Sequence, residues 1–241
     1  MHGGAAQSDV LVSVVMPCLN EEETIGACVD KARTALERLR VAGEVVVSDN
    51  GSSDRSVEIA TARGARVVHQ PTRGYGAAYL RGLEAARGAI VVIGDSDDTY
   101  DFAEIGSFVR PLLDGYEFVN GSRLAGTILP GAMPWSHQHI GNPVISWLLR
   151  TLFRAPFTDA YCGMKAFRRE LYERIRPRSL GMEFALEMVV NVGLAGLRAT
   201  EVPIVYHRRG GRSKLRTFRD GARSILFLLS YRLKLGRGRQ D

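Results

Sequence analysis

Three aspartates, Asp95, Asp97 and Asp98, lie within four positions of one another, directly after an apolar run. Carboxylates this close repel one another unless a cation or hydrogen bonds offset their charge. Mg²⁺ is typically held by one or two carboxylates, with substrate phosphates and waters completing its shell. Because alternate residues of an extended turn can aim at one point, we predict that Asp95 and Asp97 bind a divalent metal, Mg²⁺ or Mn²⁺.

The acidic run also has a purely structural interpretation. Asp98 and Asp101 lead into an apolar segment, residues 102–113, and carboxylates stabilise the N-terminus of a helix. We therefore assign Asp98 and Asp101 to helix capping and keep Asp95 and Asp97 as the predicted metal ligands.

Strands and helices alternate over the first 120 residues, which is typical of an open α/β sheet with right-handed crossovers. The strand at residues 89–93 is apolar at every position, as expected for a strand buried on both faces of a parallel sheet. Ligands bind such sheets beyond the carboxyl ends of the strands. Polar clusters follow the first, second and fourth strands at that end: Asn20-Glu21, Asp49-Asn50 and Asp95 to Asp98. We predict strands at 11–16, 44–47, 65–69 and 89–93, and helices at 21–41, 54–62 and 75–86.

The second half of the sequence is less regular. We predict a strand that ends at Gly121-Ser122-Arg123, and then a loop rich in Gly and Pro at residues 126–134. Helices at 140–153 and 182–194 and a strand at 199–205 follow. These elements are expected to pack onto the same sheet on the acceptor side.

The chain has 241 residues, which suits one large core and one catalytic domain. Its longest uncharged apolar stretch, residues 225–231, is well short of the ~20 residues that span a membrane. Residues 1–9 lack the features of a signal peptide and are expected to be disordered. Three cysteines without a CxxC pair suggest neither disulfides nor a zinc site. We therefore expect a cytoplasmic protein.

Positive charge is concentrated in the last part of the chain. The net charge is +6, but residues 207–241 hold eleven Arg or Lys against Asp220 and Asp241, a local balance of +9. Such asymmetry indicates an anionic partner or, alternatively, a solvated tail. Residues 215–235 place apolar side chains at helical spacing among arginines, so this amphipathic helix can lie on an anionic membrane or dock onto the catalytic domain. The stripe consists of Leu215, Phe218, Ala222, Ile225, Leu226, Leu229 and Leu233.

Three ordered motifs carry a resemblance to a known family. They are Val14-Val15-Met16-Pro17 with Asn20-Glu21-Glu22, then Ser48-Asp49-Asn50-Gly51-Ser52-Ser53-Asp54, and then Asp95-Ser96-Asp97. In this order they resemble the family 2 glycosyltransferases, and within that family the dolichyl- or polyprenyl-phosphate sugar synthases. The resemblance extends from Val12 to about Leu215. It implies a GT-A fold, with one Rossmann-like, mostly parallel sheet flanked by helices, and inverting transfer of mannose or glucose from GDP or UDP to a lipid phosphate.

The resemblance also implies roles for residues on the donor side. Pro17 and Glu21, next to Asn20, would lie under the base and ribose, and Asp49 would accept from the base ring. Gly74 belongs to a segment, Arg73-Gly74-Tyr75-Gly76, that resembles the family's glycine-containing loop. Asp95 and Ser96 would lie on the donor side of the metal. The donor would be GDP-mannose, UDP-glucose or UDP-N-acetylglucosamine.

On the acceptor side, the resemblance brings Arg123 to the phosphates of donor or acceptor. Asp159 matches the Asp-containing loop opposite the donor, and Glu187 the acidic position of the following helix; either could orient the acceptor or act as its base. The segment Arg208 to Leu215 resembles the family's basic loop but is one residue longer. Its cations, Arg209, Arg212 and Lys214 with Ser213, would fold over a diphosphate and stabilise the leaving group.

These observations divide the chain into residues 10–206, a GT-A domain with a nucleotide-sugar half (10–123) and an acceptor half (124–206), and residues 207–241, a basic loop and amphipathic helix. The predicted function is sugar transfer to a polyprenyl phosphate at the inner face of a membrane. A soluble glycan or small-molecule acceptor is the alternative, and a non-catalytic nucleotide or nucleic-acid binder is the second. The acidic cluster argues against nucleic acid as a ligand. The oligomeric state stays open.

Overall fold

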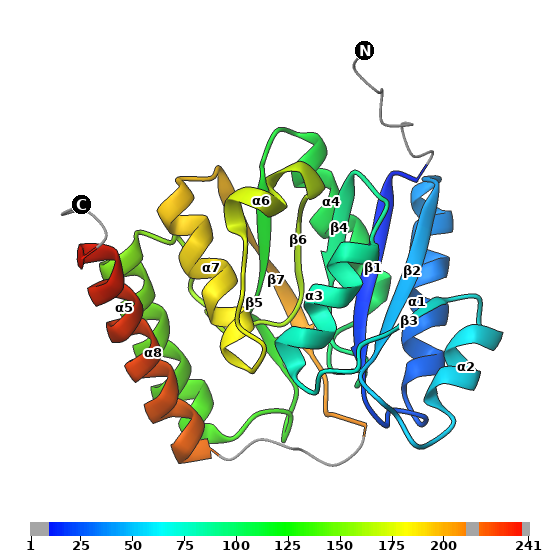
Figure 1. Ribbon diagram of the computed structural model, residues 1–241, viewed down its shortest axis with the longest axis horizontal. Coiled ribbons are helices and arrows are strands. Elements are labelled where there is room, and N and C mark those ends of the chain that lie inside the picture. The colour runs from blue at the N-terminus through cyan, green and yellow to red at the C-terminus, as the bar shows by residue number, and fades with distance from the viewer. Residues whose placement is uncertain (1–9, 211–216, 238–241) are drawn as a thin grey trace.

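The computed structural model describes residues 10–210 and 217–237, and Figure 1 shows one sheet with helices on both faces. In the described residues the sheet has seven strands in the order β3-β2-β1-β4-β6-β5-β7. The strands are β1 (Val12–Cys18), β2 (Gly43–Asp49), β3 (Arg66–His69), β4 (Ile90–Ile93), β5 (Phe118–Ile128), β6 (Lys165–Arg168) and β7 (Ala199–Tyr206). The helices are α1 (Ile25–Leu39), α2 (Ser56–Ala62), α3 (Tyr75–Ala85), α4 (Ile105–Leu113), α5 (Asn142–Phe153), α6 (Tyr172–Ile175), α7 (Glu183–Ala195) and α8 (Thr217–Arg237).

The sheet is mostly parallel, as the alternation of strands and helices predicts. β3, β2, β1 and β4 pair in parallel, and so do β5 and β7. β6 lies between β4 and β5 and runs antiparallel to both. β6 was not predicted from the sequence, because its four residues, Lys-Ala-Phe-Arg, are too short a pattern to indicate a strand. Both halves of the chain therefore belong to one continuous sheet.

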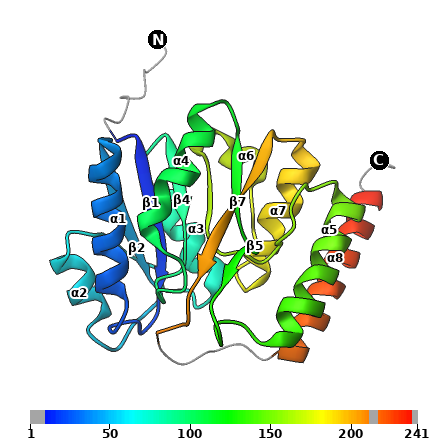
Figure 2. The same ribbon diagram turned by 180° about the vertical axis from the view of Figure 1, so that it is seen from behind.

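Side chains of the central strands alternate between two apolar layers. Val14 and Met16 of β1 face α1 and α4, whereas Val15 packs on the opposite side with Tyr79 and Phe184 from α3 and α7. All four residues of β4 are buried, as the continuous apolar run predicts. Figures 1 and 2 show α3, α6 and α7 on one face of the sheet and α1, α2 and α4 on the other. This packing fixes the ends of β1 and β4, from which the acidic loops emerge.

Most predicted boundaries shift by one or two residues, and two differ by four or more. The helix expected from Glu21 begins at Ile25, because the backbone N–H groups of Thr24 and Ile25 both donate to the Glu21 carbonyl and close a turn before the helix. β5 does not end at Arg123 but continues to Ile128 beside β7, with an irregular register after Ser122. A Cβ at Gly126 would lie 2.0 Å from the Ile204 carbonyl oxygen, so the missing side chain permits this close pairing.

The helices α5 and α8 lie side by side at one edge of the molecule (Figures 1 and 2). Tyr231 of α8 packs against Phe153 of α5 and Phe227, and its hydroxyl donates to Asn191 of α7 at 2.8 Å. Leu228 is fully buried in the same contact. The expected helix thus docks through residues outside its predicted stripe. In the part of the chain that the structure describes, neither α8 nor another helix combines the length and hydropathy needed to cross a membrane.

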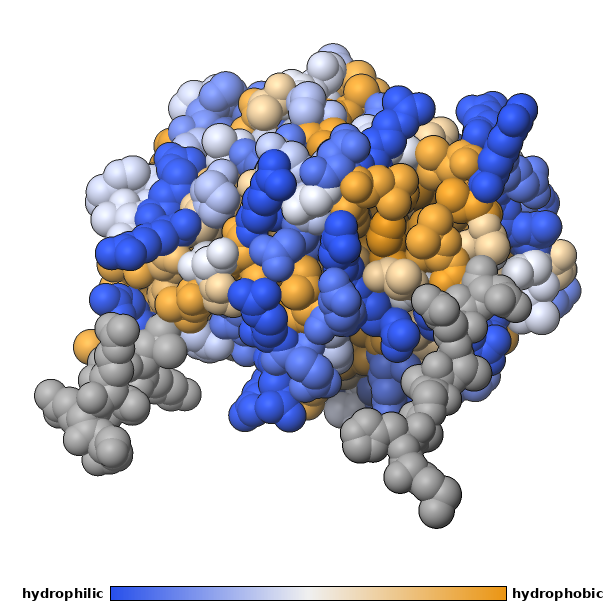
Figure 3. Space-filling model, turned by 90° about the horizontal axis from the view of Figure 1, so that it is seen from above, coloured by the Kyte–Doolittle hydropathy of each residue, from blue (hydrophilic) through white to orange (hydrophobic). Residues whose placement is uncertain are grey.

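Four residues of the predicted stripe lie at the surface of α8, whereas Leu215 and the side chains of Phe218 and Ala222 lie outside the described part of the chain. Leu226 and Leu233 are 66% and 69% exposed, and Ile225 and Leu229 are also exposed. Figure 3 shows the end of the molecule at which the parallel strands begin. There, hydrophilic side chains surround an apolar patch. The acidic loops lie at the opposite end, where β1, β2 and β4 terminate.

Candidate functional site

The Asp95 carboxylate stands at the end of β4 and is held by two tyrosines of α3. The hydroxyls of Tyr75 and Tyr79 both donate to Asp95 Oδ1, at 2.9 and 2.8 Å. They meet there because residues four apart share one face of a helix. Burial, together with the nearby charge of Asp97, raises the pKa of Asp95 to about 6, although both hydroxyls oppose this shift. Asp95 is therefore a carboxylate that gains from a nearby cation.

Asp97 is bonded differently at its two oxygens. Oδ1 accepts from the Thr99 backbone N–H at 3.1 Å and from the Thr99 hydroxyl at 2.6 Å. Oδ2 lies 3.2 Å from a guanidinium nitrogen of Arg209. The same guanidinium reaches Glu21 Oε1 at 2.9 Å. A carboxylate after β1 and one after β4 thus share one arginine from the segment that follows β7.

The Arg209 segment lies across the acidic loop as a strap, here defined as residues 206–210. The His207 N–H donates to the Thr99 carbonyl at 3.0 Å, and the Gly210 N–H donates to the Asp97 carbonyl at 3.1 Å. Tyr206 forms an isolated bridge with Tyr100 just before these contacts. A Cβ at Gly210 would lie 2.5 Å from the Thr24 methyl carbon, so glycine allows the strap to approach α1 closely.

The other two aspartates of the run have separate partners. Asp101 caps the 3₁₀ turn η1 (Phe102–Glu104) by accepting from the Ala103 N–H at 3.0 Å, which confirms its predicted capping role. Asp98 does not cap a helix. Its carboxylate lies 2.8 Å from Lys31 Nζ of α1, and its backbone φ is 60°. The prediction for Asp98 was therefore wrong, because an ion pair with α1 takes up its charge.

The first two loops of the site are joined by side-chain to backbone hydrogen bonds. Asn20 Oδ1 accepts from the Ser53 N–H at 2.8 Å, and the Ser96 hydroxyl donates to the Pro17 carbonyl at 2.6 Å. Asp49 accepts from the N–H groups of Gly51 and Ser52 at 3.1 and 3.0 Å. These bonds hold the ends of β1, β2 and β4 together. Burial alone would raise the pKa of Asp49, but the hydrogen bonds from Ser52 and Gly51 lower it below its usual range.

Gly74 lies where α3 meets the loop that precedes α7. Its N–H donates to Asn50 Oδ1 at 2.8 Å, its φ is 151°, and a Cβ there would lie 2.2 Å from the Leu180 carbonyl oxygen. Glu187 of α7 organises the same loop, because its Oε2 accepts from the N–H groups of Arg178 and Ser179 at 2.9 and 2.7 Å. Glu187 is buried, and its hydrogen bonds to the loop favour a positioning role over that of a base.

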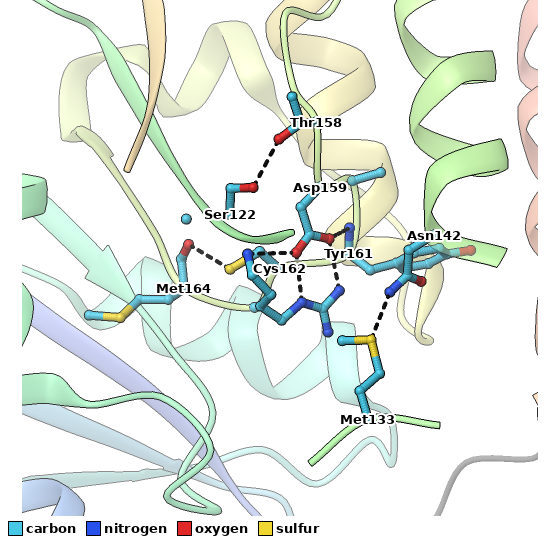
Figure 4. A network of polar contacts seen from close by, with 12 residues as sticks. Ser122, Met133, Asn142, Thr158, Asp159, Tyr161, Cys162 and Met164 are labelled. Atoms are coloured by element: carbon cyan, nitrogen blue, oxygen red, sulfur yellow. Dashed lines mark hydrogen bonds and ion pairs between the residues drawn. The ribbon is translucent and has the colours of Figure 1, made fainter. Parts of the chain in front are cut away.

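Arg123 of β5 and Asp159, in the loop between α5 and β6, form an ion pair. Arg123 Nε and Nη2 contact the two carboxylate oxygens of Asp159 at 2.7 and 2.8 Å. Asp159 also accepts from the backbone N–H groups of Arg123 and Tyr161 and is fully buried. Figure 4 shows this carboxylate beside Tyr161, with Ser122 and Thr158 joined nearby. Burial alone would raise the pKa of Asp159, but the charge and hydrogen bonds of Arg123 outweigh this effect and hold the pKa below its usual range.

This pairing argues against one of the two roles predicted for Asp159, that of the acceptor's base. A buried carboxylate with a lowered pKa and both oxygens engaged cannot receive a proton from an acceptor without losing its arginine. The Arg123 guanidinium also lies over the Tyr206 ring, 5.1 Å from its centroid. With Gln138 and His139, Arg123 lines a cavity of about 240 Å³. Asp159 thus positions Arg123, which faces the open space.

Several polar residues at the site were not identified from the sequence. Tyr75 and Tyr79 bond Asp95, and Thr99 bonds Asp97. The sequence signals were the spacing of four between the tyrosines on one helix and the place of Thr99 two positions after Asp97. Lys165 of β6 is fully buried and donates to Asn120 Oδ1 at 2.7 Å and to the Cys162 carbonyl. No sequence pattern indicates that role. Arg212, Ser213 and Lys214 lie outside the described residues.

The oxygens of Asp95 and Asp97 suit a hard cation that arrives with phosphates. Within residues 10–210 and 217–237, no cluster of three or more His, Cys, Asp or Glu could hold a metal by itself. Mg²⁺ ordinarily takes one or two carboxylates and fills its other positions with phosphates and water. The two aspartates therefore fit the predicted metal as a partial ligand set.

Comparison with known proteins agrees with this arrangement. The family model for glycosyl transferase family 2 matches residues 13–176. The low-salt glycan biosynthesis hexosyltransferase Agl6 of Haloferax volcanii is 43% identical over 228 residues, 93% of this chain and 55% of that protein. The chain thus spans about half the length of that relative. A dolichyl-phosphate hexose transferase of the same organism is 36% identical over 214 residues, 88% of this chain and 89% of that protein.

Solved structures extend the likeness to three dimensions. Glucosyl-3-phosphoglycerate synthase from Mycobacterium tuberculosis, in complex with Mn²⁺, UDP-glucose and phosphoglyceric acid, matches with a TM-score of 0.74 and 27% identity. The match covers 94% of this chain and 80% of that chain, and it confirms the expected GT-A fold. The motifs and the sheet of this protein agree with these relatives, and the family match shows that the chain belongs to glycosyl transferase family 2.

Proposed function

We propose that the protein is an inverting hexosyltransferase that moves a hexose from a GDP- or UDP-sugar to a polyprenyl phosphate. The observation that carries the proposal is the arrangement of Asp95 and Asp97 after β4, with Glu21 after β1 and Arg209 between the carboxylates. Carboxylates at the carboxyl ends of parallel strands can bind a divalent cation, and such a cation can in turn bind the diphosphate of a nucleotide sugar.

The donor would lie across the ends of β1, β2 and β4. Pro17, Asn20 and Glu21 would contact the base and ribose, and Ser96 would support Pro17 through its hydrogen bond. Asp49 holds its own loop in place, so a base contact would use its remaining acceptor capacity. Gly74 would allow the α3 loop to border the donor, and Asp95 would bind donor hydroxyls or the metal.

Transfer would proceed by a single displacement. An oxygen of the acceptor phosphate attacks the anomeric carbon, the bond from that carbon to the diphosphate oxygen breaks, and the nucleoside diphosphate leaves. Mg²⁺ or Mn²⁺, held by Asp95 and Asp97, would supply charge neutralisation for the leaving diphosphate. An acceptor phosphate is already ionised at neutral pH, so the reaction needs no strong base. Arg123 would orient the acceptor phosphate, because a guanidinium fork binds phosphate oxygens in pairs.

The surface of the acceptor half supports a lipid acceptor. The π-helical turn η2 (His137–Gly141) and α5 expose Ile140, Val144 and Trp147, spaced so that they share one face, and Trp135 precedes them. α8 exposes Leu226, Leu229 and Leu233 at the same edge. Arg150, Arg223 and Arg232 are exposed on these two helices, and the exposed Arg154 directly follows α5. Exposed aromatic and aliphatic side chains with arginines suit peripheral contact with an anionic membrane, which we place at its inner face.

A soluble phosphorylated acceptor is the second candidate. The solved neighbour holds phosphoglyceric acid, and Arg123 with its small cavity would suit the phosphate of either acceptor. The two candidates share the donor chemistry and differ in what lies beyond the phosphate. The apolar edge formed by α5 and α8 favours the lipid.

The test offers the purified protein GDP-mannose, UDP-glucose and UDP-N-acetylglucosamine with Mg²⁺ or Mn²⁺ and follows nucleotide release. Each donor is tried with polyprenyl phosphate in detergent, with 3-phosphoglycerate and without acceptor. Release that depends on both metal and polyprenyl phosphate supports the proposal. Release with 3-phosphoglycerate alone makes the soluble acceptor the substrate, and no release with any donor contradicts both candidates.

A further inference from the structure

Arg209 and a metal ion would compete for the same carboxylate oxygen. Thr99 engages Asp97 Oδ1 through both its N–H and its hydroxyl, which leaves Oδ2 as the oxygen that faces the cation. Arg209 lies 3.2 Å from that oxygen. A bound Mg²⁺ would lie only about 2.1 Å from its ligand oxygen. Two cations this close to one oxygen repel each other strongly, so the guanidinium must leave when the metal binds.

The present position of Arg209 is also incomplete. Its two terminal nitrogens contact Glu21 and Asp97, but its Nε is buried and lacks a hydrogen-bond partner among the described residues. A buried donor without an acceptor is costly, so the side chain gains if an anion offers it more acceptor oxygens. A nucleoside diphosphate carries such oxygens, in a geometry that the guanidinium fork matches.

The strap gives the arginine a short path between the two positions. Two backbone hydrogen bonds, from His207 to Thr99 and from Gly210 to Asp97, hold the strap on the acidic loop. Within those bounds the guanidinium can turn from the carboxylates to a neighbouring phosphate. Without a diphosphate it would have to leave two carboxylates for water. Metal binding alone is therefore opposed, whereas binding of metal together with diphosphate is favoured.

We propose that Arg209 acts as the resident counter-ion of the metal site and makes the site selective for a metal–diphosphate complex over the free metal. The inference rests on the proposed metal site at Asp95 and Asp97. The small protein ligand set agrees, since the described residues contain no cluster that would hold a metal alone. Arg209 thus determines which form of the metal is bound, in addition to its contact with the leaving group.

The test measures two affinities by calorimetry, that for Mn²⁺ alone and that for UDP or GDP at saturating Mn²⁺. Arg209→Gln should bind Mn²⁺ alone roughly five-fold more tightly, because a half-buried competing cation has been removed. The same variant should bind the nucleotide with Mn²⁺ roughly five-fold more weakly, because a phosphate contact is lost. Opposite signs in the two titrations distinguish this role from general damage to the site, which would weaken both.

Two further variants sharpen the test. Arg208 lies on the same strap, but its Nε donates to the Pro130 carbonyl rather than to the carboxylates. Arg208→Gln should therefore keep both affinities at the wild-type values. Arg209→Lys keeps the charge and should keep the weak binding of Mn²⁺ alone. If Arg209→Gln binds Mn²⁺ alone no more tightly than wild type, the inference is wrong. If wild type binds neither nucleotide with Mn²⁺, the proposed donor is wrong, and the titration with Mn²⁺ alone still decides the role of Arg209.

Discussion

The two halves of the sheet treat a buried carboxylate in opposite ways. In the donor half, Asp95 lies beside a second carboxylate and its pKa is raised to about 6. In the acceptor half, Asp159 lies against Arg123 and its pKa is lowered. In the first arrangement Arg209 offsets the paired negative charges only in part, whereas the second is complete without a ligand. This difference teaches that a group built for binding is left with a charge to be balanced, whereas a group built for positioning is already balanced.

The same contrast separates how the halves would recognise substrate. The donor half gathers Glu21, Asp95 and Asp97 from two neighbouring strand ends, which suits the shared metal–diphosphate part of any nucleotide sugar. In the acceptor half, Asp159 holds Arg123 in place, and α5 and α8 expose an apolar edge. The donor class should therefore depend on a few charged oxygens, and the acceptor class on a surface.

Asp97→Asn should give the largest effect on the donor half. Loss of the anionic oxygen that faces the cation should reduce metal-dependent transfer about a thousand-fold, or about 4 kcal/mol in kcat/KM. Steady-state nucleotide release with saturating Mn²⁺ measures it. Asp98→Asn is the matched control, because Asp98 pairs with Lys31 and should cost little. Normal turnover by Asp97→Asn would remove Asp97 from the metal site.

In the acceptor half, Asp159→Ala should act on stability. Removal of one partner leaves the Arg123 guanidinium buried without its counter-charge, and we expect a loss of about 3 kcal/mol in the free energy of unfolding. Urea denaturation measures it. The control Asp30→Ala breaks an exposed ion pair with Arg63 and should cost less than about 1 kcal/mol. Equal losses in the two variants would contradict the positioning role of Asp159.

The two carboxylates also give opposite pH dependences of stability. The folded pKa of Asp159 lies below its usual value of 3.8, so its contribution is present above that value and is lost as the pH falls through the folded pKa. The folded pKa of Asp95 lies above its usual value, so the folded state binds the extra proton and the contribution of Asp95 to stability falls as the pH rises from about 4 to about 6. Asp159→Asn should remove the acid-side loss, and Asp95→Asn the decline toward neutral pH, in urea titrations from pH 3 to 7.

The sequence was informative where local pattern and strand order coincide. Every acidic loop of the donor half follows a strand that the apolar pattern predicts, and the order β3-β2-β1-β4 then brings these loops together. The capping role of Asp101 was likewise predictable, because it depends on neighbours within a few residues.

Contacts that depend on distant segments could not be predicted. The pairing of Asp98 with Lys31 spans 67 positions, and that of Arg123 with Asp159 spans 36. Periodicity does not reveal which side chains meet across such distances. β6 was missed for a related reason, since its antiparallel insertion between β4 and β5 is set by sheet pairing rather than by its four residues. The same holds for α8, which docks through Leu228 and Tyr231 instead of its more obvious leucine stripe.

The exposed stripe of α8 can be tested by liposome flotation. Replacing Leu226, Leu229 and Leu233 with Ser removes apolar groups from the proposed membrane face without touching the docked face. Each should cost about 1 kcal/mol of membrane binding, so the triple variant should bind anionic vesicles about a hundred-fold more weakly. Leu113→Ser, an exposed leucine at the end of α4, is the control. Unchanged flotation of the triple variant, or a wild type that never floats at low salt, would contradict the membrane contact.

The smallest expected effect concerns how Asp95 is held ready for a cation. Tyr75→Phe removes one of the two hydroxyls that bond Oδ1 and leaves Tyr79 in place, so the fold should be retained. A lost hydrogen bond to a charged group costs about 1.5 kcal/mol, which predicts a roughly ten-fold higher KM for the nucleotide sugar.

Because the Tyr75 hydroxyl lowers the pKa of Asp95, its loss should raise that pKa above about 6. Donor affinity should then begin to fall at a higher pH than in wild type as the solution is acidified. KM measured from pH 5 to 8 tests this, with Tyr172→Phe on α6 as the control. An acid limb that stays in place would show that the two tyrosines only pack against Phe184 and do not control the charge of Asp95.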